Sequence, residues 1–101
     1  MTSLTSKQRA HLRSLANHLK PVVQIGAGGL TDAARHSLLE AFNTRELLKV
    51  KVLESAPESA RETADRIVAE MDDIHVAQTI GRTVVLYRRH PDKPEIRLPK
   101  S

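Results

Sequence analysis

The sequence predicts a single α/β domain in which three helices pack on a mixed four-stranded sheet. Its 101 residues suit one domain with one modest core. Apolar residues recur at helical or strand spacing in the order helix, strand, helix, strand, helix, strand, strand. Strand–helix–strand units predict parallel neighbours and right-handed crossovers, whereas the last two strands are joined by a tight turn and must be antiparallel.

The first half of the chain predicts two helices around a short strand. We expect a helix over residues 3–17, with Thr5 or Ser6 as its N-cap. Residues 22–25 are nearly continuously apolar, which predicts a buried strand. A second helix is expected over residues 30–43. The apolar stripes of the two helices comprise Leu12, Leu15, Ala16, Leu19, Leu30, Ala34, Leu38, Ala41 and Phe42.

A second strand and a third helix follow. Side chains alternate between two faces over residues 46–53, so Val50 takes the core face while Lys49 and Lys51 form a basic, wet face. The third helix is expected over residues 59–71, and its first turn matches a capping box of the S-x-x-E kind. Its buried stripe comprises Ala60, Ala64, Ile67, Val68 and Met71.

The last two strands are expected over residues 75–80 and 83–88. The Gly81-Arg82 pair between them is typical of a tight hairpin turn. Residues 91–101 form a short extended tail. The whole chain, 1–101, is therefore one domain with a core over about residues 4–90.

The stretch after the first strand is the most informative functional feature. Gly26, Gly28 and Gly29 are three of only four glycines in the chain. Glycine reaches positive φ without steric cost and lets a phosphate approach the backbone closely. Thr31 or Gly29 can cap the helix that follows, whose free N–H groups favour an anion. This stretch can therefore hold a phosphate with its backbone alone.

Charge is segregated along the chain. The formal net charge is +4, but residues 1–53 carry +5, residues 54–74 carry −5 and residues 75–101 carry +4. Such segregation is expected when one surface meets a polyanion and another faces away.

The residues argue against an enzyme and against a cofactor or metal site. Position six of a dinucleotide fingerprint would fall on Thr31 rather than glycine, and no G-K-[ST] motif is present. The five histidines lack metal-ligand spacing, and the absence of cysteine removes thiolate chemistry. No apolar run is long enough to cross a membrane and no leader pattern is present. We therefore expect a cytoplasmic protein with no membrane partner.

Nucleic-acid binding fits the residues better. A four-residue glycine loop between a strand and a helix is how KH-type domains hold a nucleotide backbone. Phe42 and Tyr87 are the only aromatic residues, so base stacking on aromatic side chains is not the main mechanism. Recognition would then depend on phosphates and shape, and on salt concentration.

Four blocks carry a resemblance to a known family. They are Leu19-Lys20-Pro21-Val22-Val23, Ile25-Gly26-x-x-Gly29-Leu30-Thr31, Glu46-Leu47-Leu48-Lys49-Val50-Lys51-Val52, and Ile80-Gly81-Arg82 with Val85-Leu86-Tyr87-Arg88. In this order, over about residues 4–98, they resemble the CRM domain (chloroplast RNA splicing and ribosome maturation) of the stand-alone bacterial YhbY type.

The resemblance implies an RNA-binding domain with a GxxG loop. It also implies a fold similar to the C-terminal domain of translation initiation factor three with a helix added at the N-terminus. Its bacterial members associate with precursors of the large ribosomal subunit, and plant relatives carry the domain in group II intron splicing factors. Two positions depart from the pattern: Ala27-Gly28 stand where relatives often have a basic or polar residue, and Arg45 where many have His. The loop must then act through the N–H groups of residues 27–30.

We therefore expect a monomeric, non-enzymatic protein that contacts ribosomal RNA and assists large-subunit assembly. The alternative is a protein-interaction module that docks through its acidic third helix on a ribosomal protein or an assembly factor. The expected RNA contacts are Gly26, Ala27, Gly28, Gly29, Lys7, Arg9, Arg13, Lys20, Arg35, Lys49, Lys51, Arg82 and Arg88.

Overall fold

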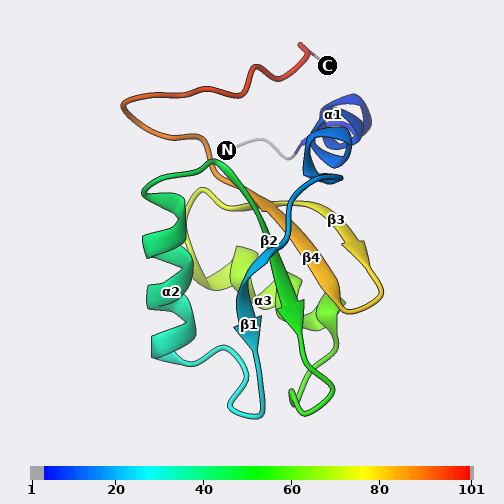
Figure 1. The fold of residues 1–101 in the computed structure, drawn as a ribbon, viewed down its shortest axis with the longest axis vertical. Helices are drawn as coiled ribbons and strands as arrows, with labels where there is room; N and C mark the ends of the chain where they lie inside the picture. Colours follow the sequence, from blue (N-terminus) through cyan, green and yellow to red (C-terminus); the bar gives the residue numbers. More distant parts are fainter. Residues whose placement is uncertain (1–3, 101) are drawn as a thin grey trace.

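Three helices and four strands follow one another in the predicted order (Figure 1). The structure, a computed structural model, describes residues 4–100, so the predicted helix start at residue 3 lies outside the described residues. The helices are α1 (Ser6–Ala16), α2 (Asp32–Phe42) and α3 (Ala60–Glu70). The strands are β1 (Pro21–Ile25), β2 (Leu47–Val52), β3 (His75–Ile80) and β4 (Thr83–Tyr87).

The strands form one sheet in the order β1-β2-β4-β3, so β1 and β3 are its two edges. β1 and β2 are parallel, whereas β2 with β4 and β3 with β4 are antiparallel. The predicted mixed sheet is confirmed. The second strand–helix–strand unit does not give parallel neighbours, because β4 lies between β2 and β3 and pairs with both.

The prediction that β1 is fully buried is wrong for one of its faces. Val23 and Ile25 are buried, but Val22 and Gln24 are exposed. β1 is an edge strand that packs against α2 on one face, while α1 lies mainly over β2, β3 and β4 on the other. The outer face of β1 therefore stays open.

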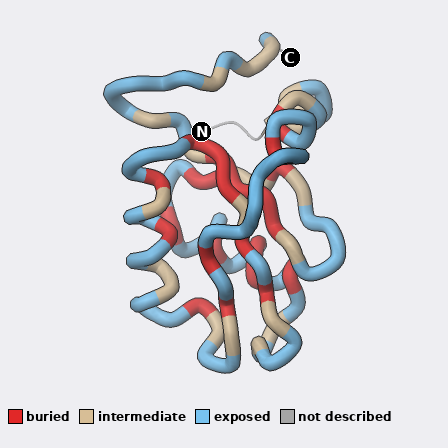
Figure 2. Tube along the Cα trace, viewed as in Figure 1, coloured by how far each residue is buried: buried red, intermediate tan, exposed pale blue. Residues whose placement is uncertain are grey.

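The two faces of the sheet carry separate cores. α2 and α3 cover one face, where Val84 and Leu86 join the larger cluster. α1 and the C-terminal segment cover part of the other face, where Val85 and Tyr87 join the smaller cluster. Figure 2 shows the buried residues concentrated along the strands. Side chains of β4 therefore alternate between the two cores, and burial of each contributes about 1.5–3 kcal/mol.

Side-chain caps fix where each helix begins. The Thr5 hydroxyl accepts the Gln8 N–H in a capping box, and the Thr31 hydroxyl caps α2. The predicted capping box of Ser59 and Glu62 is confirmed at the start of α3. Each cap satisfies backbone donors that the helix leaves free, a contribution of about 1 kcal/mol.

The predicted apolar stripes are correct at their centres and wrong at their margins. Leu12 and Ala16 of α1 are buried, but Leu15 is 41% exposed and Leu19 is 36% exposed. α1 ends before Leu19 and turns only the Leu12–Ala16 row toward the sheet. Val68 of α3 is 44% exposed for the same reason, since it lies beside the buried row of its helix.

The C-terminal segment, residues 90–100, is held against the α1 side of the sheet. The buried carboxylate of Glu46 accepts the backbone N–H groups of His90, Glu95 and Ile96, each at 2.7 Å. Ile96 and Leu98 pack against the smaller core cluster. The predicted extended tail is thus part of the packed structure, although it adds no strand to the sheet.

Candidate nucleic-acid interface

The glycine stretch forms a tight turn between β1 and α2. The Gly29 N–H donates to the Gly26 carbonyl at 2.9 Å, and the Thr31 N–H donates to the Gly29 carbonyl at 2.9 Å. Gly29 has a φ of 69°, in the left-handed region that glycine adopts without strain. The chain then enters α2 with Thr31, one of the two expected caps, as the N-cap.

The turn leaves several backbone donors available. Among the hydrogen bonds formed by residues 4–100, none uses the N–H group of Ala27, Gly28 or Leu30. Gly29 differs, because its N–H is engaged in the turn. Of the four N–H groups over residues 27–30 that were expected to contact a phosphate, three are therefore available. They lie beside the free donors of the first turn of α2.

Surrounding atoms constrain two of the three glycines. A Cβ at Gly29 would lie 3.0 Å from Cγ of Pro57, which follows β2, in addition to the strain of its φ. A Cβ at Gly28 would lie 2.9 Å from the Thr31 methyl group. Gly26 has an ordinary φ, and its Cβ would meet Leu53 at 3.7 Å, a normal contact distance. The turn itself accounts for glycine at 28 and 29 but not at 26.

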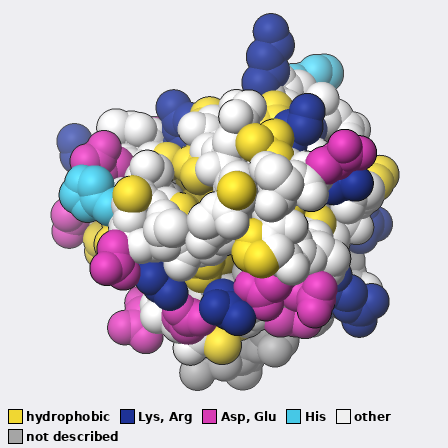
Figure 3. All heavy atoms as spheres, turned by 90° about the horizontal axis from the view of Figure 1, so that it is seen from below, with side chains coloured by type: hydrophobic (Ala, Val, Ile, Leu, Met, Phe, Trp, Pro, Cys, Tyr) yellow, Lys and Arg dark blue, Asp and Glu magenta, His cyan; other side chains and the backbone are white. Residues whose placement is uncertain are grey.

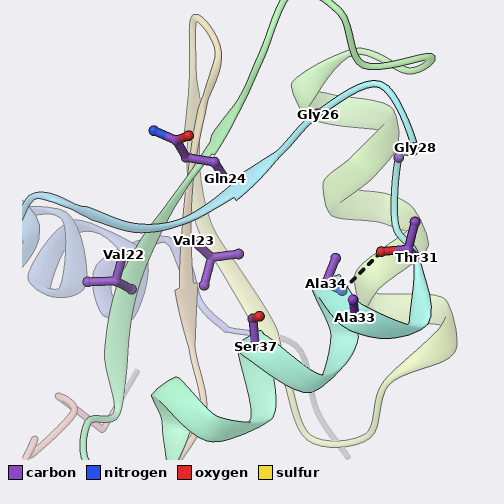
Figure 4. Close-up of a pocket in the computed structure, with 10 residues that line it drawn as sticks. Val22, Val23, Gln24, Gly26, Gly28, Thr31, Ala33, Ala34 and Ser37 are labelled. Carbon is purple, nitrogen blue, oxygen red and sulfur yellow. Dashed lines mark hydrogen bonds between the residues drawn. The ribbon is translucent and has the colours of Figure 1, made fainter.

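A pocket of about 360 Å³ lies beside the turn, between β1 and the first turns of α2 (Figure 4). Every side chain contributed by the turn and by α2 is small. The lining residues are Val22, Val23, Gln24, Gly26, Gly28, Gly29, Thr31, Ala33, Ala34 and Ser37. Ala33 and Ser37 were not among the predicted site residues, although two small residues four positions apart lie on one face of a helix and could have indicated such a surface.

Several of the predicted RNA contacts are cations on the α1 side of the sheet. Lys51 is exposed and Lys49 is half-buried on the face of β2 opposite α2 and α3, as predicted. Lys7 and Arg13 are exposed on α1, and Lys20 is exposed just before β1. Neither α1 nor any of the four strands contains an acidic residue. This side of the molecule is therefore positive over α1 and β2.

Three predicted contacts are already engaged within the protein. Arg35 pairs with Asp32 at 3.0 Å and also with Glu70. Arg82 pairs with Glu54 at 3.3 Å.

Arg9 donates from its guanidinium to the Leu4 carbonyl at 2.7 Å. The charges of Arg35 and Arg82 are partly balanced by carboxylates, and the side chain of Arg9 is less free to move than those of the exposed lysines.

The predicted contacts do not form a single cluster. Lys51 pairs in register with Thr83 and Gln24, near the end of the sheet where the glycine turn lies. Lys20 and Arg88 flank the opposite end, because they precede β1 and follow β4. The candidate interface therefore extends along the length of the sheet.

The end of the molecule that carries the glycine turn is poor in charge at its centre. Figure 3 shows this end with mostly uncharged atoms in the middle and side chains of both signs around the rim. This is the appearance expected where Ala27 and Gly28 form the loop tip. A ligand at this point meets backbone groups before it meets charged side chains.

The described residues show neither a candidate metal site nor a membrane-spanning helix. Within residues 4–100, no three His, Asp or Glu side chains gather in a way that could hold a metal ion. None of the helices in this range combines the length and apolar character needed to span a membrane.

Comparison with known proteins places the chain in a family. A family model for the CRS1/YhbY (CRM) domain matches residues 4–88. The probable RNA-binding protein YqeI of Bacillus subtilis is 41% identical over 96 residues, covering 95% of this chain and 99% of YqeI. An RNA-binding protein of Haemophilus influenzae is 41% identical over 101 residues, covering both chains completely.

A solved structure confirms the fold. The solution structure of protein SAV1595 from Staphylococcus aureus superposes with a TM-score of 0.79 at 36% identity, covering 95% of this chain and 99% of that one. The match of family model, relatives and fold agrees with the glycine turn and the block order of the sequence. The chain belongs to the CRS1/YhbY (CRM) domain family.

Proposed function

We propose that this protein binds ribosomal RNA in the cytoplasm, as a monomer, and assists assembly of the large ribosomal subunit. Relatives that match nearly the whole chain are named as RNA-binding proteins. The CRM resemblance supplies the link to the ribosome. The physical support comes from the distribution of charge and from the glycine turn.

The observation that carries the proposal is the group of exposed cations on the α1 side of the sheet, where neither α1 nor any strand contributes an acidic residue. Exposed cations on α1 and β2 stand on this side without carboxylates from the same elements. The acidic residues of α3 lie in the layer on the opposite face. A polyanion would therefore approach one face and be repelled by the other.

The glycine turn adds a contact that needs no charged side chain. The N–H groups of Ala27, Gly28 and Leu30 can donate to phosphate oxygens, and glycine lets the RNA backbone approach closely. Gly26 and Gly29 close the turn that presents these donors. Lysines on the adjacent sheet face supply the charge that the loop lacks.

The cations contribute unequally in this proposal. Lys49, Lys51, Lys7, Arg13 and Lys20 make the main phosphate contacts. Arg9, Arg35, Arg82 and Arg88 contribute less, because the first three are engaged within the protein and Arg88 is half-buried far from the turn.

The alternative of docking through the acidic helix has weaker support. Glu70 pairs with Arg35 and Arg66, and Glu58 pairs with Arg66. These contacts neutralise part of the acidic surface that the sequence places on α3 and its flanks. A protein partner at this surface would meet a smaller negative charge than the sequence alone suggests.

A filter-binding titration with a structured fragment of large-subunit ribosomal RNA tests the proposal. We expect micromolar or tighter binding that weakens about a hundredfold between roughly 50 and 200 mM salt, which corresponds to about four phosphate contacts. No binding at low salt would contradict the proposal.

A matched pair of variants tests the face that is used. Lys51→Gln removes a cation from the α1 side, and Arg61→Gln removes an exposed cation from α3 on the other side. We expect Lys51→Gln to weaken binding several-fold and to make the salt dependence shallower by about one counterion, with Arg61→Gln unchanged. Equal effects of the two changes would show that binding does not select this face.

A further inference from the structure

We infer that the RNA held at the glycine turn is single-stranded, and that one of its bases enters the pocket between β1 and α2. This inference rests on the proposed function and names the form of RNA that the same site takes. Its support comes from the shape of the pocket and from the free edge of β1.

The pocket is a slot with short walls. Its volume is about 360 Å³, and its α2 wall consists of Ala33, Ala34 and Ser37. Figure 4 shows these residues facing β1, with the glycine turn at one end of the space. Because neither the turn nor α2 places a long side chain along the slot, a flat ring can enter it from the side of the turn.

The other wall of the slot offers unpaired backbone groups. Alternate residues of a strand direct their N–H and C=O groups to opposite sides, and the Ile25 carbonyl points toward β2, where it accepts the Leu53 N–H at 2.8 Å. The N–H and C=O of Gln24 therefore point to the free edge of β1. An adjacent donor and acceptor match the hydrogen-bonding edge that every unpaired nucleobase presents.

The backbone groups of Gln24 can be reached by a base of single-stranded RNA but not by a base of an RNA duplex. In an RNA duplex the pairing edges face each other and the bases remain stacked, so a paired base cannot enter a slot behind the phosphate contacts. A single strand can turn a base out of its stack at small cost. A duplex would contact only the outer tip of the turn.

The surface along β1 continues the path for such a strand. Val22, 46% exposed, lines both this pocket and a second pocket of about 350 Å³. The second pocket carries His18, Lys20 and Arg45 at the far end of β1. No carboxylate lines either pocket. β1 is about 17 Å long. An RNA strand that leaves the turn along β1 therefore meets apolar surface first and positive charge after it.

An extended peptide could also add to a free strand edge, but β1 suits it poorly. Pro21 lacks an N–H group, and the register of the strand is irregular between Pro21 and Val23. Few backbone pairs remain for a peptide, and none of them uses the donors of the turn. We therefore assign the edge to RNA, and make peptide binding an outcome of the test.

The test compares two leucine variants of α2 on two RNA forms. Ser37→Leu fills the slot, whereas His36→Leu places the same side chain on an exposed position outside it. Affinities are measured by fluorescence anisotropy, at one salt concentration, for a single-stranded RNA of about ten nucleotides and for the same sequence as a duplex. Thermal unfolding checks that both variants fold.

We expect the parent to bind the single strand at least about tenfold more tightly than the duplex, and Ser37→Leu to remove that difference while His36→Leu keeps it. Amide exchange of Gln24 should also slow in the presence of the single strand and not of the duplex. Equal affinity for both forms in the parent, or an unchanged preference in Ser37→Leu, would overturn the inference and leave the proposed function standing. Loss of all RNA binding in the parent would overturn both.

A final arm adds an unlabelled valine-rich peptide as competitor. We expect it to leave RNA binding unchanged. Displacement of the single strand, together with protection of the Gln24 amide by the peptide alone, would reassign the edge to a protein partner.

Discussion

At the scale of single residues, Glu46 shows how backbone N–H groups can hold a buried charge. The residue is 5% exposed. Burial on its own would raise the pKa of Glu46, but N–H bonds from Ile96, His90 and Glu95 outweigh it and lower the pKa below the ordinary 4.5. The carboxylate therefore fastens the C-terminal segment in its ionised form.

The sign of this pKa shift predicts how stability depends on pH. Because the folded-state pKa is lower than the unfolded one, the carboxylate stabilises the fold above about pH 4.5, and this contribution is lost as pH falls through the folded-state value. Glu46→Gln should cost about 1–3 kcal/mol at neutral pH, because an amide cannot accept all three N–H bonds. It should also flatten the acid limb of the stability curve. Urea unfolding of both proteins at several pH values measures this.

Amide exchange provides the local control for Glu46→Gln. The amides of residues 90, 95 and 96 should lose protection, while those of β2 and β4 keep it. Unchanged protection of these three amides would show that the segment is held by Ile96 and Leu98 instead.

The roles of single residues could be predicted where their partners lie nearby in the sequence. They could not be predicted where the partners lie far away in the sequence. Ser59 and Glu62 cap α3 as their spacing indicates, because both partners lie in one turn. The role of Glu46 has no local signature, since its three donors lie 44 to 50 positions away. The ion pairs of Arg35 and Glu70 escaped prediction for the same reason.

At the scale of elements, the glycines of the turn are constrained to different degrees by the structure. Gly29 is required by its φ of 69° and by the nearness of Pro57, and its N–H closes the turn. Gly26 has neither a positive φ nor a close neighbour that would exclude a side chain. The two glycines that define the GxxG pattern therefore stand in different physical situations.

Alanine at each position should separate these situations. Gly29→Ala should destabilise the fold by about 1–2 kcal/mol, because it forces a left-handed φ and a close contact. Gly26→Ala should be neutral or stabilise by up to about 1 kcal/mol, since it only restricts the unfolded chain. Urea unfolding compares them. A loss of stability in Gly26→Ala equal to that in Gly29→Ala would contradict this account of the turn.

The elements themselves were predictable, but the place of β1 in the sheet was not. Apolar spacing and the turn residues give all seven elements in order, because those signals are local. Strand order depends on which strands meet in space, and a short apolar run looks the same at an edge as in the centre. The open edge of β1, and with it the pocket, therefore emerged only from the structure.

At the scale of the whole molecule, the sheet separates two electrostatic surfaces. Within the basic first part of the sequence, α1 and β2 carry exposed cations on one side of the sheet, whereas the acidic middle becomes α3 and its flanks on the other side, where α2 also packs. The segregation seen along the chain is thus kept in space. Membership of the CRM family confirms the expectation of a non-enzymatic protein.

The central claim is that backbone donors at the glycine turn meet RNA phosphates, and Ala27 tests it most directly. Ala27 is exposed at the loop tip with an ordinary φ, so charged side chains there leave the fold intact, unlike at Gly29. In filter binding with the ribosomal RNA fragment, we expect Ala27→Lys to tighten binding and Ala27→Glu to weaken it, by about tenfold each way, with equal thermal stabilities. If both variants bind as the parent does, the turn is not the RNA contact.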